Sequence, residues 1–453
     1  MSDSTGKARR QWLAAAAANA GEISGYLGAR MAGLRFAAPE GSTVLAPLVL
    51  APATVAAVHR TAFRLTGLVT DLGMRIAAGD ARRLAAAVGF TGPGNPAARL
   101  IGNAPSWGWS PAIVRPDMVL VGGAPKLIEL NFNSTLSGSI DSDALARAFA
   151  GLSGQLRLAP PRVEPGFTAA RGRLALDVAA AANLDTPPRI ALVYSGRERA
   201  RRYSRFVDEE FECLSRQGLD VILAEIGELC FDRTALSFQG RPVDVAFRVY
   251  NTESALRLGY DPDLLADLEQ VRVTTFLATA ECLLFTSNAL LAMLFDEIHS
   301  LPARDQRLVT SSVPWTVRVT DRRVVRDGIA CDLGRHAVER QSDLVLKPLN
   351  GHSGDRVVFG CDVSAAEWSD ALESAFRAAD SCLQERVVPD TTSVPVHDHC
   401  SGRASVHRLP SVLGPYRLGR HTGGIAVRHP TPGSAEHAIN WDNGVMHNVA
   451  LTA

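Results

Sequence analysis

Lysine is almost missing from this chain of 453 residues. Its 47 basic side chains include only three lysines, Lys7, Lys126 and Lys347, so the other 44 are arginines. A phosphate-binding P-loop needs glycine, lysine and serine or threonine in succession. Only Lys7 follows a glycine, and Ala8 comes next. The HRD and DFG triplets of protein kinases are also missing. The sequence therefore excludes a P-loop NTPase and a typical protein kinase.

The chain also lacks excess charge and a long apolar run. Its 47 basic and 47 acidic side chains balance, which leaves no field to steer it toward nucleic acid or an anionic membrane surface. Residues 44–58 are largely apolar but contain two prolines, and they fall short of the roughly 20 residues of a membrane span. The basic N-terminus is followed by alanine, which is less apolar than a signal-peptide core. We expect a cytoplasmic protein that binds neither nucleic acid nor membrane.

The seven cysteines are widely spaced and form no CxxC motif. An odd number without paired spacing argues against a disulfide framework or a zinc ribbon, so we expect reduced thiols. Residues 397–400 read His-Asp-His-Cys, but no further ligand spacing accompanies them, and a solvated loop is favoured over a metal site.

With 46% hydrophobic residues, the chain is long enough for two or three domains. Four regions are expected. They are a helical N-terminal region at 1–100, a strand hairpin region at 101–185, a small parallel α/β unit at 186–300, and a strand-rich region at 301–453. The alternation behind the third region is a strand at 189–195, a helix at 203–217, and strands at 219–225 and 244–250.

Residues 112–121 and 126–133 predict two strands joined by a turn at Gly-Gly-Ala-Pro. If they pair antiparallel about Gly123, Asp117 faces Glu129 and Arg115 faces Asn131. The two-residue period then places all four side chains on one face. Facing carboxylates repel, so a cation between them is expected. Mg²⁺ suits an Asp, a Glu and an Asn oxygen. The alternative is a solvated hairpin face with an Arg–carboxylate pair.

The polar residues that follow, Asn133, Ser134 and Thr135, are expected to form a substrate-facing loop.

A second polar region surrounds Lys347. Residues 343–349 and 355–360 predict strands on either side of Asn-Gly-His-Ser-Gly, whose glycines let backbone N–H groups approach a phosphate. Lys347 stands alone among Leu346, Pro348 and Leu349 in a chain that otherwise uses arginine, which suggests a need for a compact point charge. A plain structural turn is the alternative. Ser364 and Glu367 then form a capping box at the start of a helix, and residues 381–388 predict a strand with polar Gln384 and Glu385.

Together the two regions resemble the ATP-grasp carboxylate-amine ligases. The order of motifs is similar to the permuted arrangement of glutathionylspermidine synthetase and eukaryotic glutathione synthetase. The matching strings are Arg115-x-Asp117, Glu129-x-Asn131, LVLKPLNGHSG at 344–354 and LQERVV at 383–388. The implied fold is a mixed α/β (α+β) ATP-grasp fold, with the parallel unit as a pre-ATP-grasp unit, and the implied cofactors are ATP and Mg²⁺.

The resemblance also implies roles for single residues. Asp117, Glu129 and Asn131 would bind Mg²⁺, Arg115 would contact the reacting phosphoryl or carboxylate group, and Lys347 would bind ATP phosphate. The ATP site would be completed by the loop residues Gly351, Ser353 and Gly354 and by Gln384 and Glu385 at the adenine. Among the arginines near the C-terminus, Arg417, Arg420 and Arg428, we choose Arg428 for the active site.

Three departures from the family pattern matter. Relatives carry a second ATP-binding lysine on a preceding strand, where this chain has Arg318. The glycine loop contains His352 and ends at Asp355. No hydrolase domain is visible. We expect a ligase that joins a small carboxylate, glutamyl for example, to an amine. The alternatives are a kinase-like phosphotransferase and an idle nucleotide-binding module. The oligomeric state stays open.

Overall fold

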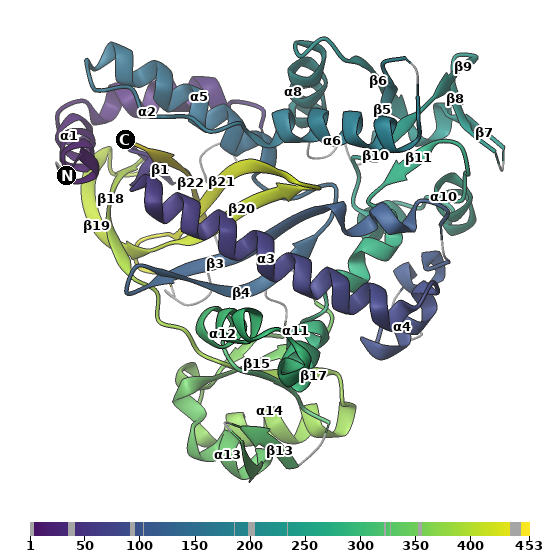
Figure 1. Ribbon diagram of the computed structural model, residues 1–453. Helices are drawn as coiled ribbons and strands as arrows, with labels where there is room; N and C mark the ends of the chain where they lie inside the picture. Colours follow the sequence, from purple (N-terminus) through teal and green to yellow (C-terminus); the bar gives the residue numbers. More distant parts are fainter. Residues whose placement is uncertain are drawn as a thin grey trace.

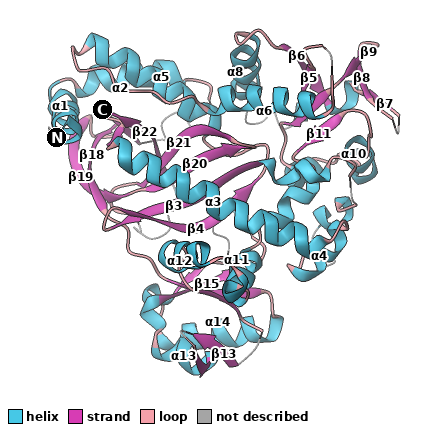
Figure 2. Cartoon of the chain, viewed as in Figure 1, coloured by secondary structure: helices cyan, strands magenta, loops and turns pink. Residues whose placement is uncertain are grey.

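The computed structural model shows a broad main body with a smaller lobe beside it (Figure 1). The residues it describes are 4–34, 41–90, 96–102, 104–184, 186–197, 204–232, 234–320, 323–326, 328–351, 356–434 and 445–453. Helices and strands are mixed throughout both parts (Figure 2), as expected for an α/β protein. No helix of these described segments has the length and apolar character needed to cross a membrane.

A six-stranded sheet with the order β2-β22-β21-β20-β3-β4 forms the centre of the main body. Strands from both ends of the sequence therefore lie beside the predicted hairpin, β3 and β4. All neighbours are antiparallel except β2 and β22. The bounds are β2 Leu48–Leu50, β3 Ile113–Val121, β4 Ala124–Phe132, β20 Val412–Leu418, β21 His421–Pro430 and β22 Val445–Thr452.

The two faces of this sheet belong to different cores. Val114 and Val427 pack in the core of α3, whereas their chain neighbours Ile113 and Ala426 pack in the core of α5 and α6, as the two-residue period of strands requires. Figure 1 shows α3 crossing the sheet. Pro52 opens this helix, at a position where its missing N–H costs nothing. The helices are α1 Ser4–Ala18, α2 Ala20–Met31, α3 Pro52–Ala77, α5 Ser139–Gln155 and α6 Phe167–Ala181.

The parallel α/β unit predicted from the alternation of elements is present. Its strands have the order β11-β10-β5-β6, and all three neighbouring pairs are parallel. Helices α6 and α8 pack against it. The bounds are β5 Arg189–Tyr194, α8 Ser204–Ser215, β6 Asp220–Glu225, β10 Val245–Arg248, α9 Thr252–Arg257, α10 Pro262–Glu269 and β11 Thr275–Leu277.

The smaller lobe has a four-stranded sheet, β12-β17-β15-β16, and a hydrophobic core of its own around Trp368. The predicted capping box is formed: Ser364 Oγ accepts from the Glu367 N–H, and the Glu367 carboxylate accepts from the Ser364 N–H. The bounds are β12 Thr316–Arg318, β13 Arg323–Arg326, β14 Ile329–Asp332, α13 Leu333–Glu339, β15 Leu344–Pro348, β16 Val358–Phe359, α14 Ala365–Ala378 and β17 Ser381–Glu385.

Residues 1–100 are mainly helical where described, but they also contain two strands that join C-terminal partners. β1 (Ser42–Val44) pairs with β18 (Thr391–Asp398), and β2 pairs with β22. The remaining elements are α4 Ala81–Ala87, η1 Pro96–Leu100, η2 Trp107–Ala112, η3 Ile226–Glu228, β7 Cys230–Phe231, β8 Leu236–Phe238, β9 Arg241–Val243, η5 Ile298–Ser300, α12 Ala303–Ser312, η6 Gln341–Asp343, η7 Gly360–Asp362 and β19 Arg403–Pro410.

The apolar segment of residues 280–298 contains two helical elements. The chain forms a 3-10 helix, η4 (Ala280–Thr286), and then an α-helix, α11 (Asn288–Asp296). Ser287 lies between them in an extended conformation, and its hydroxyl accepts from the Ala289 N–H. A serine that caps a helix in this way starts a new helix instead of continuing the old one.

Candidate active site

The hairpin pairs in the predicted register at the polar residues. Arg115 lies opposite Asn131, and Asp117 lies opposite Glu129. The turn residues Gly122 and Gly123 both have positive φ, which suits a two-residue hairpin. Nearer the turn the register is shifted by one residue, so β4 contains a bulge at Ile128. A bulge leaves its extra residue outside the regular ladder, and the Ile128 carbonyl is used by another element, as described below.

Asp117 lies between two arginines. Its Oδ1 is 3.1 Å from Arg115 Nε, and its Oδ2 is 2.5 Å from Arg428 Nη2. Each of these three residues is only 4% exposed. Burial opposes ionisation of Asp117, but the charges of Arg115 and Arg428 outweigh it and hold its pKa below the ordinary value. The pair of arginines is therefore fixed by one ionised carboxylate.

A glycine makes room for this arrangement. Gly414 of β20 lies beside the hairpin, and a Cβ there would stand 2.7 Å from Cδ of Arg115. The Arg115 side chain can therefore lie flat over β20 and donate from Nη1 to the Ser137 carbonyl. Among the three C-terminal arginines, Arg428 is the one that reaches the hairpin. Arg417 bonds to Thr66, and Arg420 pairs with Asp177.

Glu129 and Asn131 supply the oxygen atoms that remain on this face. Asn131 Nδ2 donates to the Arg115 carbonyl at 3.3 Å, which leaves its Oδ1 as an acceptor. Burial and the neighbouring Asp117 raise the pKa of Glu129, against the lowering effect of Lys347 and the arginines. A carboxylate and an amide oxygen suit Mg²⁺, which completes its shell with water and substrate phosphates. The residues fit such an ion, although both oxygens of Asp117 are already held by arginines.

Lys347 joins the lobe to the hairpin. Its Nζ donates to the Ile128 carbonyl at 3.0 Å and to Gln384 Oε1 at 2.7 Å. Gln384 in turn donates to Thr316 Oγ1 at 3.0 Å, which fixes its amide. Lys347 also lies near enough to Glu129 to affect its pKa. The two regions singled out in the sequence, more than 200 residues apart, therefore meet at one place.

Arg318 and Lys347 lie at the same level of the lobe sheet, on either side of Cys382 of β17. Both residues pair with Cys382, Arg318 from β12 and Lys347 from β15, so their side chains start from one face of the sheet. The Arg318 guanidinium donates to the Ala87 carbonyl at 3.2 Å, at the end of α4. Arg318, at the position where the sequence resemblance predicts a second lysine, is thus bound to the main body.

Glu385 follows Gln384 on β17 and points to the opposite face of the sheet, because successive residues of a strand face opposite sides. Its carboxylate bonds to Arg326 of β13, which also bonds to His336 at 2.7 Å. Gln384, one residue earlier, is the member of the predicted pair that contacts Lys347.

The start of the glycine loop is anchored to the main body. Asn350 Nδ2 donates to the carbonyls of Val88 at 2.8 Å and Gly89 at 3.2 Å. Gly351 follows it directly. Ser353 and Gly354, which are predicted to bind ATP, lie outside the described residues.

The predicted substrate loop is held by two buried arginines that the sequence reading missed. Arg248 Nη2 donates to Asn133 Oδ1 at 3.2 Å, and Arg171 donates to the Ser134 carbonyl. Thr135 folds back on Asn133 through its backbone N–H at 3.4 Å. Each arginine has an acidic neighbour, Glu269 at 3.7 Å for Arg248 and Glu210 for Arg171. The signal available in the sequence was Arg248, a single arginine in the otherwise apolar run of residues 245–250.

The histidines of residues 397–400 bond to hydroxyl groups. His397 Nδ1 is 3.1 Å from Ser24 Oγ, and His399 Nε2 is 2.8 Å from Thr43 Oγ1. Within the part of the chain that the structure describes, no cluster of three metal-binding His, Cys, Asp or Glu side chains occurs.

This geometry defines the class of fold. A strand with Lys347 in a small lobe, a strand with Gln384 beside it and an acidic hairpin from a larger sheet make an ATP-grasp fold. The hairpin precedes Lys347 in sequence. The chain is similar in structure to the glutathione synthetase-like effector GSS30 from Globodera pallida in its apo form. The TM-score is 0.60 at 10% identity, over 98% of this chain and 96% of that chain.

Two further solved structures are more distant. The putative gamma-glutamylcysteine synthetase from Methylobacillus flagellatus has a TM-score of 0.44 and 13% identity, over 85% of this chain and 88% of that chain. The D-alanyl-alanine synthetase A from Vibrio cholerae has a TM-score of 0.29 and 12% identity, over 58% and 88%. No protein-family model and no curated protein matches the sequence. At 10% identity the likeness establishes the fold alone.

Proposed function

We propose that the chain is an ATP-dependent carboxylate-amine ligase. It would join the carboxylate of an amino acid or a short peptide to an amine through an acyl phosphate. One observation carries the proposal: Lys347 Nζ lies 3.0 Å from the carbonyl of Ile128, one residue before Glu129. A lysine that could bind phosphate thus lies near Glu129 and Asn131, whose oxygens suit Mg²⁺, and near Arg115 and Arg428, which Asp117 holds.

Each group has a part in the proposed reaction. Lys347, oriented by Gln384, would bind ATP phosphate, and the sequence motif assigns Gly351, Ser353 and Gly354 to the same phosphate site. Mg²⁺ held by Glu129 and Asn131 would neutralise charge on the phosphates. Asp117 positions Arg115 and Arg428, which carry the positive charge that an anionic substrate requires.

The steps follow from simple chemistry. A carboxylate is a poor electrophile, so one of its oxygens first attacks the γ-phosphorus of ATP, and ADP leaves. The amine nitrogen then attacks the carbonyl carbon of the acyl phosphate and loses a proton, and inorganic phosphate leaves. Arg115 and Arg428 would stabilise the oxyanion of this second step. Fixed donors of this kind cost no reorganisation during reaction.

The loop of Asn133, Ser134 and Thr135 is the proposed substrate wall. Arg248 and Arg171 hold it from behind through fully buried side chains. A γ-glutamyl dipeptide is the first product to test, in line with the resemblance of the motifs.

The test is a turnover assay with ATP, Mg²⁺ and a panel of carboxylates and amines. Release of ADP and phosphate that requires both a carboxylate and an amine supports the ligase. ADP without free phosphate would instead indicate a phosphotransferase, and nucleotide binding without turnover an idle module. Lys347→Ala should abolish turnover, whereas Lys7→Ala, which changes an exposed lysine of α1, should not.

A further inference from the structure

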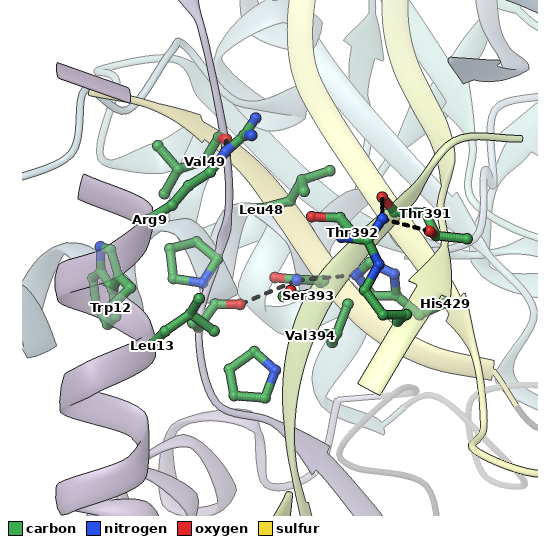
Figure 3. A pocket seen from close by; sticks show the side chains of 15 residues that line it. Arg9, Trp12, Leu13, Leu48, Val49, Thr391, Thr392, Ser393, Val394 and His429 are labelled. Carbon is green, nitrogen blue, oxygen red and sulfur yellow. Dashed lines mark hydrogen bonds between the residues drawn. The ribbon is translucent and has the colours of Figure 1, made fainter. Parts of the chain in front are cut away.

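A pocket lies in the main body, apart from the candidate active site. It opens between α1, residues 46–49 and β18, and its volume is about 200 Å³. Figure 3 shows Arg9, Trp12 and Leu13 of α1 on one side and Thr391 to Val394 of β18 across from them. None of its lining residues belongs to the hairpin or to the ATP site proposed above.

The lining carries positive charge and no negative charge. It contains Arg9 and Arg408 but no aspartate or glutamate. Arg9 Nε donates to the Val49 carbonyl at 2.7 Å, and Arg408 Nη2 donates to Thr391 at 3.1 and 2.9 Å. Both arginines are exposed at the mouth of the pocket and are oriented by neutral acceptors, and within the described segments neither forms a salt bridge. The positive charge of the pocket is left without a countercharge from its own lining.

The floor is polar but neutral. His429 is fully buried, and burial lowers its pKa to about 4, so it carries no charge near neutral pH. Asn448 Nδ2 bonds to His429 Nε2 at 3.2 Å and to the Ala46 carbonyl at 3.1 Å. His429 Nδ1 lies 3.2 Å from the Pro410 carbonyl. These groups satisfy one another, so the floor needs no ligand to complete it.

The walls are apolar. Trp12, Leu13, Leu48 and Val394 line the cavity between the arginines and the floor, and Figure 3 shows these four around the space. A volume of about 200 Å³ lies below the roughly 300 Å³ at which drug-sized pockets begin. The occupant must therefore be about as large as one amino acid, with an apolar body and an anionic end.

We propose that this pocket binds a small apolar carboxylate, whose anionic end pairs with Arg9 and Arg408 and whose body lies against Trp12 and Leu13. A free amino acid is disfavoured, because its ammonium group would find no carboxylate in the lining and would lie beside two cations. Inorganic phosphate satisfies the arginines but leaves the apolar walls unfilled. The proposal does not rest on the ligase reaction.

The test compares 4-methylpentanoate with leucine, which has the same carbon skeleton and an added ammonium group. Binding to the full chain is measured by calorimetry and by ligand-observed NMR, with phosphate as a third probe. We expect saturable binding of 4-methylpentanoate and at least about tenfold weaker binding of leucine and of phosphate, since a charge-assisted hydrogen bond is worth a factor of this order.

Arg9→Gln and Arg408→Gln should each weaken binding of 4-methylpentanoate about tenfold. Arg403→Gln, at the other end of β19, should leave it unchanged. The melting temperature of each free variant shows whether its fold is intact. Equal binding of leucine, no binding by the wild type, or binding that neither arginine variant weakens would each overturn the proposal. So would a dimer that covers the pocket and excludes the acid, as judged by sedimentation.

Discussion

At the scale of single residues, the candidate active site depends on one carboxylate. The sequence places Asp117 and Glu129 as a matched pair of metal ligands, but the two have different surroundings. Asp117 is held by two arginines and its pKa is lowered, whereas burial and its acidic neighbour raise the pKa of Glu129. We infer that Asp117 positions Arg115 and Arg428 and that Glu129 is the carboxylate that would bind the cation.

Two substitutions separate these roles. Asp117→Asn leaves two buried arginines without their anion, so it should lower the free energy of unfolding by about 3–5 kcal/mol and reduce turnover at any Mg²⁺ concentration. Glu129→Gln should lower stability much less and should raise the Mg²⁺ concentration needed for half-maximal turnover. Urea unfolding and Mg²⁺ titration of activity measure both effects. Equal Mg²⁺ shifts in the two variants would contradict the division of roles.

His429 predicts a pH dependence of stability. Its pKa is about 4 in the folded chain and about 6.5 when unfolded. Between these values the unfolded state binds a proton that the folded state does not, so stability falls as pH falls from 6.5 to 4. The loss is about 3 kcal/mol. His429→Gln should lack this component, so the unfolding free energies of the two proteins should differ less at pH 4.5 than at pH 7. A constant difference would show that His429 does not contribute.

At the scale of elements, the end of α4 connects the lobe to the main body. Asn350 donates to the carbonyls of Val88 and Gly89, and Arg318 donates to that of Ala87. The last carbonyls of a helix lack partners within the helix and accept such donors. The sequence predicted that Arg318 stands in place of the second lysine of the family pattern. Its partner could not be predicted, because α4 lies more than 200 residues away.

Asn350→Ala should release the start of the glycine loop from α4. Two hydrogen bonds of about 1 kcal/mol each are lost, so the KM for ATP should rise several-fold while kcat changes little. The matched control is Asn19→Ala, which removes a side-chain bond to the Ala15 carbonyl in the N-terminal helices. Steady-state kinetics over ATP concentration would test this. An unchanged KM for ATP, or the same rise in the control, would count against the anchor.

The strength and the limit of sequence reasoning both show in the hairpin. The two-residue period and the Gly-Gly turn correctly predicted which side chains share a face. The bulge at Ile128 was not predicted, because no residue type marks it. The two-residue turn alone would pair the strands one residue away from the predicted register. The bulge corrects this offset, so that Asp117 lies opposite Glu129 as predicted. The parallel unit was predicted for the same kind of reason, since its strands and helices alternate locally. Arg171 and Arg248 were missed because their partners come from other units.

At the scale of the whole molecule, the site lies where the lobe meets the main body. The lobe has its own core around Trp368, and Lys347 contacts the main sheet through Ile128. Figure 1 shows the lobe extending from one side of the main body, and the chain ends lie close together on the other side. Local patterns indicated the elements of both bodies. Local patterns could not predict the order of strands in the main sheet, because β2 and β22 pair across almost the whole sequence.

This arrangement predicts how nucleotide changes unfolding. The lobe has a core of its own around Trp368 and can unfold in a step of its own, so without ligand we expect the lobe to melt at a lower temperature than the main body. ATP analogue with Mg²⁺ would contact Lys347 in the lobe and Glu129 in the main sheet. Ligand at about 100 times its Kd stabilises the state that binds it by about 2.7 kcal/mol. Because that state requires both bodies folded, the lower transition should rise toward the upper one.

Differential scanning calorimetry, with tryptophan fluorescence as a second probe, would follow the two transitions. Lys347→Ala should abolish the shift of the lower transition, and Lys7→Ala should preserve it. Removal of Mg²⁺ with a chelator should reduce the shift in the wild type, since Glu129 would then face the phosphates without a cation between them. The nucleotide could instead raise the unfolding temperature of only one part, the lobe or the main body. That result would place the nucleotide site inside that part and would contradict a site shared by the lobe and the hairpin.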